Sequence, residues 1–169
     1  YLRVELAMHE KEAQFRATME AAQVGIFLLQ DDLFRYVNPF LANLLGYSES
    51  ELVGHLSPLD LIVPEQRDMV REKIRQRAAG EPGTPYELTG VRKDGSTLPV
   101  MILGSPTTFE GRPASVGTLL DISAQKEAEM RVRELADFDP LTGLPNRRLL
   151  RDRSTQLLAA AGRDGSEMA

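Results

Sequence analysis

The spacing of hydrophobic residues changes several times along the chain, and each change predicts a different element. Residues 1 to about 22 contain no glycine or proline and place apolar side chains at helical spacing, so they predict an amphipathic helix. Two short apolar runs follow, at Val24–Gln30 and Leu33–Val37, with two aspartates between them as a turn signal. These runs predict a buried strand and its return strand, joined as a β-hairpin.

Short helical segments separated by glycine and proline occupy the next part of the chain. Asn38-Pro39 favours a helix start, because the asparagine can cap free N–H groups and proline suits the first helical position. Ser48–Glu51 has the spacing of a capping box and predicts a second short helix. A longer helix is expected from Pro64 to about Ala79, where Gly80 ends it.

Strand-like spacing returns after residue 85. Tyr86–Arg92 and Thr97–Thr108 read as two strands joined by a tight turn, and a last strand is expected from about Ala114 to Ile122. Five strands with a helical cluster inserted after the second predict an α+β fold. In such a fold the helices pack on one face of an antiparallel sheet.

Composition narrows the chemistry open to this chain. The 20 basic and 25 acidic residues give a formal net charge of −5, which argues against general nucleic-acid binding. There is no cysteine, which excludes disulfides, zinc–thiolate sites and thiol catalysis. No phosphate-cradling glycine-rich loop, metal-ligand cluster or nucleophile with a nearby base is visible, so the chain is not expected to be catalytic alone or to hold a metal.

Charge and hydropathy also bear on partners and location. The longest apolar run, Val24–Leu29, is too short to span a bilayer, so no membrane contact is expected within the chain and a cytoplasmic location is the default. The chain begins with Tyr1, which leaves a membrane anchor upstream in a longer parent protein open. Basic residues alternate with acids along the predicted long helix, which indicates a solvated face rather than a nucleic-acid surface. They are Arg67, Arg71, Lys73, Arg75 and Arg77.

Four stretches, in the same order and spacing, resemble the PAS family of sensor domains. They are Phe15–Ala22, Tyr36–Ser48, Arg92–Gly95 and Gly117–Ser123. The resemblance implies a five-stranded antiparallel sheet with short helices packed on one face, flanked by N- and C-terminal helices. It divides the chain into an N-terminal helix (1–22), a PAS sensor domain (23–123), a signalling linker helix (124–138) and a final segment (139–169).

PAS domains enclose a pocket between the sheet and the short helices, and the resemblance implies lining positions here. The same spacing is expected of a filled core, which needs no ligand. If a ligand binds, an apolar small molecule is implied, with Asn38 and Tyr86 offering polar contacts. The candidate lining residues are Phe27, Leu29, Asn38, Leu61, Ile62, Met69, Tyr86, Leu88, Met101, Leu103 and Leu119.

Known PAS cofactors leave recognisable residues, which this chain lacks. LOV-type flavin photochemistry needs a cysteine and is excluded. Alignment with that family places Leu119 and Val100 where Gln and Asn bond the flavin ring, which argues against other flavin binding as well. Haem-binding PAS domains use a histidine on the long helix, where this chain has Arg71; His55 lies in a loop and His9 precedes the domain. The cofactor, if any, stays unknown.

The end of the PAS-like region is the expected route for a signal. PAS domains typically end in Asp-Ile-Thr, and Asp121-Ile122-Ser123 takes that place. Asp121 is expected to hold the strand end, with Arg92 or Lys93 as partner, and Ser123 to cap the next helix. That helix carries apolar residues at the spacing of a two-stranded coil, which is also the spacing of a solvated helix with a few apolar positions. This seam consists of Ala128, Val132 and Leu135.

A further motif follows the linker helix. The run from Asp139 to Arg148 resembles the opening segment of a GGDEF domain, the diguanylate cyclase module of bacterial cyclic-di-GMP signalling. On spacing alone an ordinary helix start would be favoured. The position of the run, after a sensor-like domain and a charged helix, favours the GGDEF interpretation instead. No Gly-Gly-Asp/Glu-Glu-Phe sequence occurs in the chain, so the catalytic part of that domain is absent. The motif residues are Asp139, Leu141, Thr142, Leu144, Pro145, Asn146 and Arg147.

The two resemblances together imply a PAS sensory, regulatory and dimerisation module of a GGDEF or GGDEF-EAL protein. A signal would reach cyclic-di-GMP turnover through the C-terminal helix. Because a diguanylate cyclase joins two GTP molecules held by two GGDEF domains, a homodimer through the flanking helices is expected. The alternative is a PAS interaction scaffold without ligand, in a parent with a degenerate GGDEF domain and an active phosphodiesterase domain.

Overall fold

The structure, a computed structural model, describes residues 1–164 of the chain. It contains two compact units, Tyr1–Ser123 and Ala124–Ala169, which are treated separately below. The predicted final segment, 139–169, therefore extends beyond the described residues at positions 165–169. No helix within residues 1–164 has the length and apolarity needed to cross a membrane.

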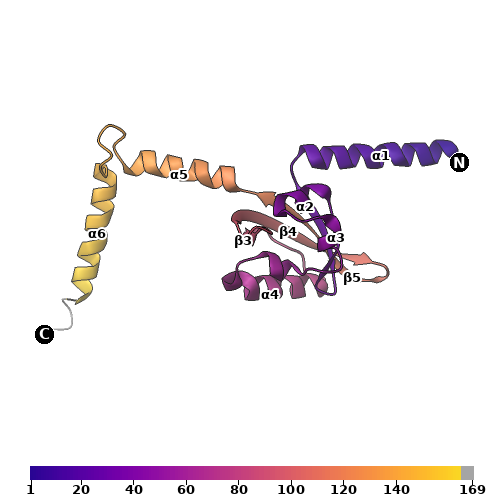
Figure 1. The fold of residues 1–169 in the computed structure, drawn as a ribbon. Helices are drawn as coiled ribbons and strands as arrows, with labels where there is room; N and C mark the ends of the chain where they lie inside the picture. The colour runs from indigo at the N-terminus through magenta and orange to yellow at the C-terminus, as the bar shows by residue number, and fades with distance from the viewer. Residues whose placement is uncertain (165–169) are drawn as a thin grey trace. The chain divides into compact units, whose positions relative to one another are not determined.

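Five strands form one antiparallel sheet in the order β2-β1-β5-β4-β3 (Figure 1). The first hairpin and the last three strands are joined where β1 pairs with β5, from Gly25 opposite Leu119 to Leu29 opposite Ser115. The predicted α+β fold with a five-stranded antiparallel sheet is thus confirmed. The strands are β1 (Gly25–Gln30), β2 (Leu33–Val37), β3 (Tyr86–Val91), β4 (Thr97–Phe109) and β5 (Arg112–Asp121).

Helices between β2 and β3 cover one face of the sheet. They are α2 (Pro39–Leu45), α3 (Glu49–Leu52), the 3-10 turns η1 (Pro58–Leu61) and η2 (Pro64–Gln66), and α4 (Arg67–Ala78). The predicted helix from Pro64 therefore opens as a 3-10 turn, a common way for an α-helix to begin. Both predicted N-caps are present: the Asn38 side chain accepts from the Leu41 N–H, and Ser48 with Glu51 forms a capping box.

The turns explain why the strands meet in this register. Gln30 pairs with Leu33 across a two-residue loop, and Asp31 and Asp32 have φ angles of 55° and 61°. This left-handed pair matches the twist of a hairpin, and aspartate tolerates it because its short side chain bonds the local backbone.

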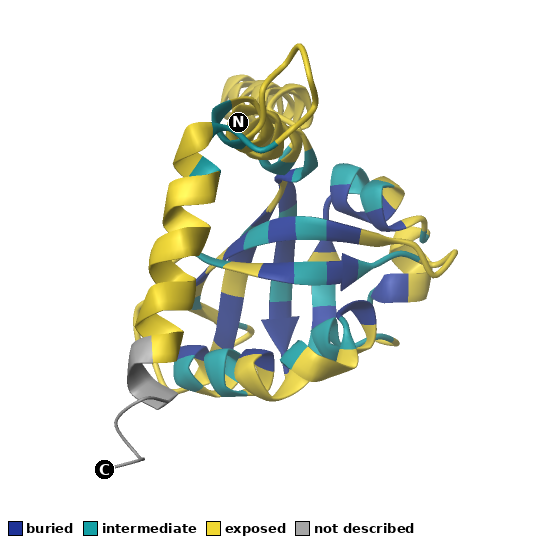
Figure 2. Cartoon of the chain, turned by 90° about the vertical axis from the view of Figure 1, so that its left-hand side faces the viewer, coloured by how far each residue is buried: buried dark blue, intermediate teal, exposed yellow. Residues whose placement is uncertain are grey.

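The hydrophobic core lies between the sheet and the helices that cover it. Its most buried side chains, Leu41, Leu52, Leu98, Val37 and Val100, come from two helices and two strands. Figure 2 shows that buried positions gather on the strands and on the sides of the helices that face them. Burial of this kind is the main favourable term in folding, at about 25 cal/mol per Å² of apolar surface.

The flanking helices lack such burial. Helix α1 (Leu2–Ala21) and helix α5 (Ser123–Asp137) contain no buried residue. The predicted N-terminal helix is present, and none of its residues is buried in the single chain. A third long helix, α6 (Arg147–Asp164), follows α5 in the second unit.

Candidate functional site

An internal cavity of about 70 Å³ lies between the inner face of the sheet and the helices α2, η1 and α4. All five strands contribute to its wall, because side chains of alternate residues point inward on each strand. Apolar groups form most of the lining, and polar groups are confined to a few positions on α4, β3 and β5. The cavity is therefore suited to the apolar part of a small molecule.

Most of the predicted lining residues do reach this cavity. Phe27 and Leu29 reach it from β1, and Leu119 reaches it from β5. Phe27 also stands edge-on to Phe34, with ring centroids 6.0 Å apart, so an aromatic pair fills one end of the core. The predicted residues that line the cavity are Phe27, Leu29, Leu61, Ile62, Tyr86, Leu88 and Leu119.

Two predicted lining residues on β4 lie on the wrong face of the sheet. Leu103 is 39% exposed and Met101 is half-buried, whereas Val100 and Ile102 are buried and line the cavity. The prediction is wrong by one residue, and in a strand a one-residue shift moves every side chain to the other face.

Met69 and Asn38 are also absent from the lining. Met69 is 40% exposed on α4, on the side away from the core. Asn38 is buried and its side chain bonds to the backbone: its Oδ1 accepts from the Ile26 and Leu41 N–H groups, and its Nδ2 donates to the Val24 carbonyl. It joins β1 to the start of α2 and offers no contact to a ligand.

Glycines make room around the cavity. Gly117 on β5 pairs with Phe27, and a Cβ at position 117 would collide with the Phe27 ring. Gly104 on β4 stands opposite Gly117 and also lines the cavity. The Phe27 ring can lie over β5 because position 117 carries no side chain, whereas a Cβ at position 104 would lie beside Ser115 and Arg77.

A charged residue that the sequence placed on a solvated face is buried beside the cavity. Arg77 on α4 is 5% exposed and lines the cavity together with Lys73, one turn earlier. Its Nη1 donates to the Glu81 and Pro82 carbonyls, each at 2.7 Å. The prediction of a wholly solvated basic face is therefore wrong for Arg77.

Tyr86 on β3 lies next to these two cations. The Nζ of Lys73 is 5.6 Å from the centre of the Tyr86 ring. Burial raises the pKa of the Tyr86 hydroxyl, and the positive charge of Arg77 opposes that rise. Tyr86, Lys73 and Arg77 thus lie together beside a cavity whose wall is almost entirely apolar.

The residues considered for haem or metal binding lie away from the cavity. The Nδ1 of His55 is bonded to the Val53 carbonyl on the surface, and His9 is on the exposed helix α1. Arg71 is exposed and paired with Asp68. Within residues 1–164 no three His, Asp or Glu side chains gather as metal ligands would.

The junction between the sheet and α5 is held by local contacts. Asp121 Oδ1 accepts hydrogen bonds from the Ser123 backbone N–H at 2.8 Å and from the Ser123 hydroxyl at 2.5 Å. Ile122 is buried, and its N–H donates to the Pro99 carbonyl. The strand end is therefore anchored in the core one residue before the helix begins.

Two expectations for this junction are wrong. Asp121 does not pair with Arg92, which donates to the Leu44 carbonyl, or with Lys93, which pairs with Glu51. Ser123 is the first residue of α5 rather than the residue that caps it, and the hydrogen bond of its hydroxyl is donated to Asp121. A neighbour two residues away is reached without ordering a long side chain, so the local contact replaces the long-range ion pair.

In the second unit, the Asp139–Arg147 motif forms a closed turn between α5 and α6. Asp139 Oδ1 accepts from the Leu141 and Thr142 N–H groups, and Thr142 Oγ1 accepts from the Leu144 N–H. Asn146 caps α6, and its Oδ1 accepts from the N–H groups of residues 148 and 149. Pro145 precedes the helix, and Arg147 is its first residue. The motif residues thus have a structural role in this turn.

The predicted seam on α5 is exposed within the single chain. Val132 and Leu135 are each 68% exposed, and Ala128 is exposed as well. Ala128 and Val132 line a shallow groove between α5 and α6 together with Leu149, whereas Leu135 does not. The pairing of two copies through this seam stays a prediction.

Comparison with known proteins agrees with this architecture. A family model described as the PAS fold matches residues 13–122. An uncharacterised signalling protein of Caulobacter vibrioides is 25% identical over 156 residues, which are 92% of this chain and 19% of the relative. The chain spans less than a fifth of the length of the curated relatives it matches.

Solved structures show the same fold. The PAS domain of an HTR-like protein from Haloarcula marismortui aligns with a TM-score of 0.61 at 25% identity, over 72% of this chain and 100% of that one. The N-terminal domain of a diguanylate cyclase with PAS/PAC sensor from Marinobacter aquaeolei gives 0.51 at 19% identity, over 61% and 98% of the two chains, a likeness of fold alone. With the family match over residues 13–122, these findings show that the chain belongs to the PAS family of sensory domains found in signalling proteins.

Proposed function

We propose that this PAS domain is the sensory and dimerising module of a longer diguanylate cyclase, and that it acts through α5. The observation that carries the proposal is the direct connection between the last strand, β5, and the helix α5. β5 ends at Asp121, Ile122 is anchored in the core, and α5 begins at Ser123 and leads to the motif that starts at Asp139. A change in the core at the end of β5 would reach the start of this helix directly.

The cavity supports a sensory role with a small ligand. An engineered cavity of about 150 Å³ accommodates one benzene ring. The cavity here, at about 70 Å³, is smaller than that, whereas a flavin has three fused rings and a haem is larger still. Its size and apolar lining favour a compact molecule over either cofactor, and Leu119 and Val100 line it where a flavin would need polar partners.

The proposed output is the synthesis of cyclic-di-GMP, and the proposal rests on the motif and on the relatives. The Asp139–Arg147 run resembles the opening of a GGDEF domain, one structural neighbour is the N-terminal domain of a diguanylate cyclase, and a curated relative is a signalling protein. Two GGDEF domains must approach each other to join two GTP molecules. A homodimer through α1 and α5 would bring them together, and the unburied faces of both helices are available for this.

The test uses the parent protein that contains this chain, with GTP as substrate and cyclic-di-GMP measured by mass spectrometry. Asp121→Ala removes the bonds at the junction. Asp94→Ala is a matched control, because Asp94 accepts from the N–H at 2.8 Å and the hydroxyl at 2.6 Å of a serine two residues later, Ser96, in the turn between β3 and β4.

The proposal predicts that the parent makes cyclic-di-GMP, that Asp121→Ala changes the rate roughly fivefold or more, and that Asp94→Ala leaves it unchanged. A parent that forms no cyclic-di-GMP from GTP would refute the cyclase assignment. Equal effects of the two substitutions would refute the junction as the route of the signal.

A further inference from the structure

The buried polar side chains of the PAS body differ in how they are paired. Within residues 1–164 they are Gln30, Asn38, Arg77 and Ser115. The first three each donate to backbone carbonyls. The Ser115 hydroxyl has no hydrogen-bond partner among the described residues, although Ser115 is only 6% exposed. Because a buried hydroxyl is normally paired, this one is available to a partner from outside the chain.

Ser115 lies on the cavity side of β5. It lines the cavity together with Leu119, which is four residues later on the same strand and therefore on the same face. A Cβ at Gly104, which also lines the cavity, would lie 3.6 Å from the Ser115 Oγ. Since Gly104 carries no side chain, space is open beside the hydroxyl. A molecule in the cavity can therefore reach the Ser115 Oγ.

A groove on the surface adjoins the cavity at the same place. Gln30, Arg112 and other residues from the turn ends of β1 and β5 line this groove. Leu29, Ile74 and Ser115 line both the groove and the cavity. Ser115 thus lies between the cavity and the protein surface, on the shortest way in for a small molecule.

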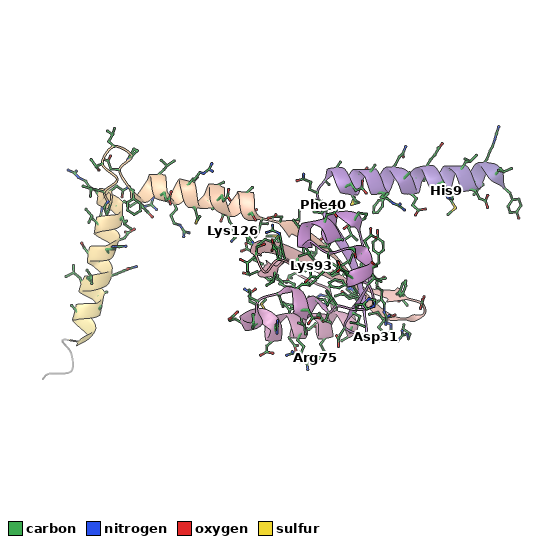
Figure 3. All side chains as sticks on the ribbon, viewed as in Figure 1. His9, Asp31, Phe40, Arg75, Lys93 and Lys126 are labelled. Carbon is green, nitrogen blue, oxygen red and sulfur yellow. The ribbon has the colours of Figure 1, made fainter. Side chains whose placement is uncertain are left out.

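Charged groups near the cavity are directed elsewhere. Figure 3 shows Arg75 of α4 pointing away from the sheet, where it pairs with Glu72. The Lys73 Nζ lies 5.6 Å from the centre of the Tyr86 ring, and Arg77 donates to two carbonyls of the following loop. A charged ligand would lose its hydration in the apolar cavity without gaining a counter-ion, so an uncharged ligand is favoured.

The chemistry beside Ser115 favours a hydrogen-bond acceptor that carries no donor of its own. A serine hydroxyl has one O–H to donate, and the wall around it is almost entirely apolar. A carbonyl oxygen accepts this bond and leaves no donor unpaired, whereas an alcohol or an amide brings a further O–H or N–H into apolar surroundings. A buried water molecule needs about two to four polar partners, more than Ser115 alone supplies.

We propose that the cavity binds a small uncharged ketone or aldehyde, whose oxygen accepts a hydrogen bond from the Ser115 hydroxyl. An engineered cavity of about 150 Å³ holds one benzene ring, so a cavity of about 70 Å³ holds about three to four non-hydrogen atoms. Leu29, Ile74 and Ile102 line the apolar part and would contact the carbon atoms. This deepens the proposed function, because it assumes that the cavity is the sensor's ligand site.

Titration of the chain with acetone, followed in the ¹H–¹⁵N NMR spectrum, tests this proposal. The backbone N–H signals of Gly104 and Ser115 should shift saturably, with a dissociation constant on the order of 10 mM, since so small a ligand gains little contact area. Acetamide and 2-propanol have nearly the same shape but bring additional donors. Both should bind at least threefold more weakly than acetone.

Substitutions around the hydroxyl locate the site. Ser115→Ala removes the donor and should weaken acetone binding about fivefold. Ser105→Ala, at an exposed position on the outer face of β4, is the matched control and should leave binding unchanged. Gly104→Ala places a methyl group at ordinary contact distance from the Ser115 Oγ, so it should weaken acetone binding at least tenfold in a chain that still folds.

Xenon, which fills apolar cavities without hydrogen bonds, reports whether Ser115→Ala leaves the cavity intact. It should shift the methyl signals of Leu29 and Ile102 equally in the wild type and in this variant. The proposal is overturned if acetone gives no saturable shift, which would leave the hydroxyl to a buried water. It is also overturned if 2-propanol binds as tightly as acetone, or if Ser115→Ala and Ser105→Ala have equal effects.

These outcomes are independent of the enzyme assay on the parent. A parent that makes cyclic-di-GMP while the chain does not bind acetone refutes the ligand class alone. A chain that binds acetone in a parent without cyclase activity refutes the output alone.

Discussion

The PAS body and the helices that flank it are stabilised by different means. Between Gly25 and Ile122 the chain buries a continuous core in which Leu52 and Val100 are fully enclosed. Helices α1 and α5 contain no buried residue, whereas most helical stability in proteins comes from tertiary packing of one face. The body has a core of its own, whereas the flanking helices have no packed surface in the single chain. This is the arrangement expected of a sensor whose output depends on how its helices associate.

The same substitution in the two regions should have very different effects. Leu52→Ala removes a side chain with 0% exposure and should lower the free energy of unfolding by about 2–5 kcal/mol. Leu135→Ala on α5 removes a 68% exposed side chain and should change it by less than about 0.5 kcal/mol in dilute protein. Urea unfolding measures both. A large effect of Leu135→Ala that grows with protein concentration would show that the seam is an interface between copies.

Asn38→Ala should produce the next largest effect. It leaves the Ile26 and Leu41 N–H groups and the Val24 carbonyl without their partner, at a cost of about 2–3 kcal/mol. Asn43→Ala, at an exposed position of α2, is the matched control and should be nearly neutral. If urea unfolding gives similar values for the two, Asn38 does not hold β1 to α2.

Gly117→Ala should destabilise the body by overpacking. The added methyl group would collide with the Phe27 ring, and such strain typically costs about 1–3 kcal/mol. Phe27→Leu in the same chain should relieve part of this cost, because the smaller side chain leaves room for the methyl. Thermal unfolding of the single and double variants measures the coupling, and simple additivity would contradict the contact.

The smallest expected effect depends on pH. The hydrogen bond from the Lys93 ammonium and the bond from the Ser48 N–H lower the pKa of Glu51 to about 2. Because this pKa is below its usual value of 4.5, the pair stabilises the fold above pH 4.5 and loses that contribution as the pH falls through about 2.

Glu51→Gln should therefore lower the melting temperature slightly at pH 7, less so in high salt, and the difference from the wild type should vanish near pH 2. Both side chains of the pair are about half exposed to solvent, so the difference at pH 7 is expected to be small. A difference that persists unchanged below pH 2 would mean that the Glu51 charge is not its cause.

Short-range signals made the fold predictable. The capping box at Ser48–Glu51 and the N-cap at Asn38 depend on residues within a few positions, and both are present. The cavity wall was harder to predict, because positions 100–103 read Val-Met-Ile-Leu and four apolar residues in a row do not reveal which face is inward. The pairing of Ile102 with Leu119, both of which line the cavity, shows which of these residues face inward.

Arg77 could have been found from the sequence. Val70 and Ile74 line one side of α4, and Arg77 continues their four-then-three spacing toward the core. Its alternation with acids suggested a solvated position instead. The partner of Asp121 could not be derived in the same way, because local and distant partners are chemically equivalent until the fold places them.

Amide hydrogen exchange of the chain at several protein concentrations tests the central comparison most directly. We predict that β1, β4 and β5 exchange slowest at every concentration, and that α1 and α5 exchange rapidly in dilute protein and become protected as the concentration rises. If α1 and α5 are as strongly protected as β5 in dilute protein, the flanking helices do not depend on a second copy, and the proposed role of α5 in a sensor dimer is wrong.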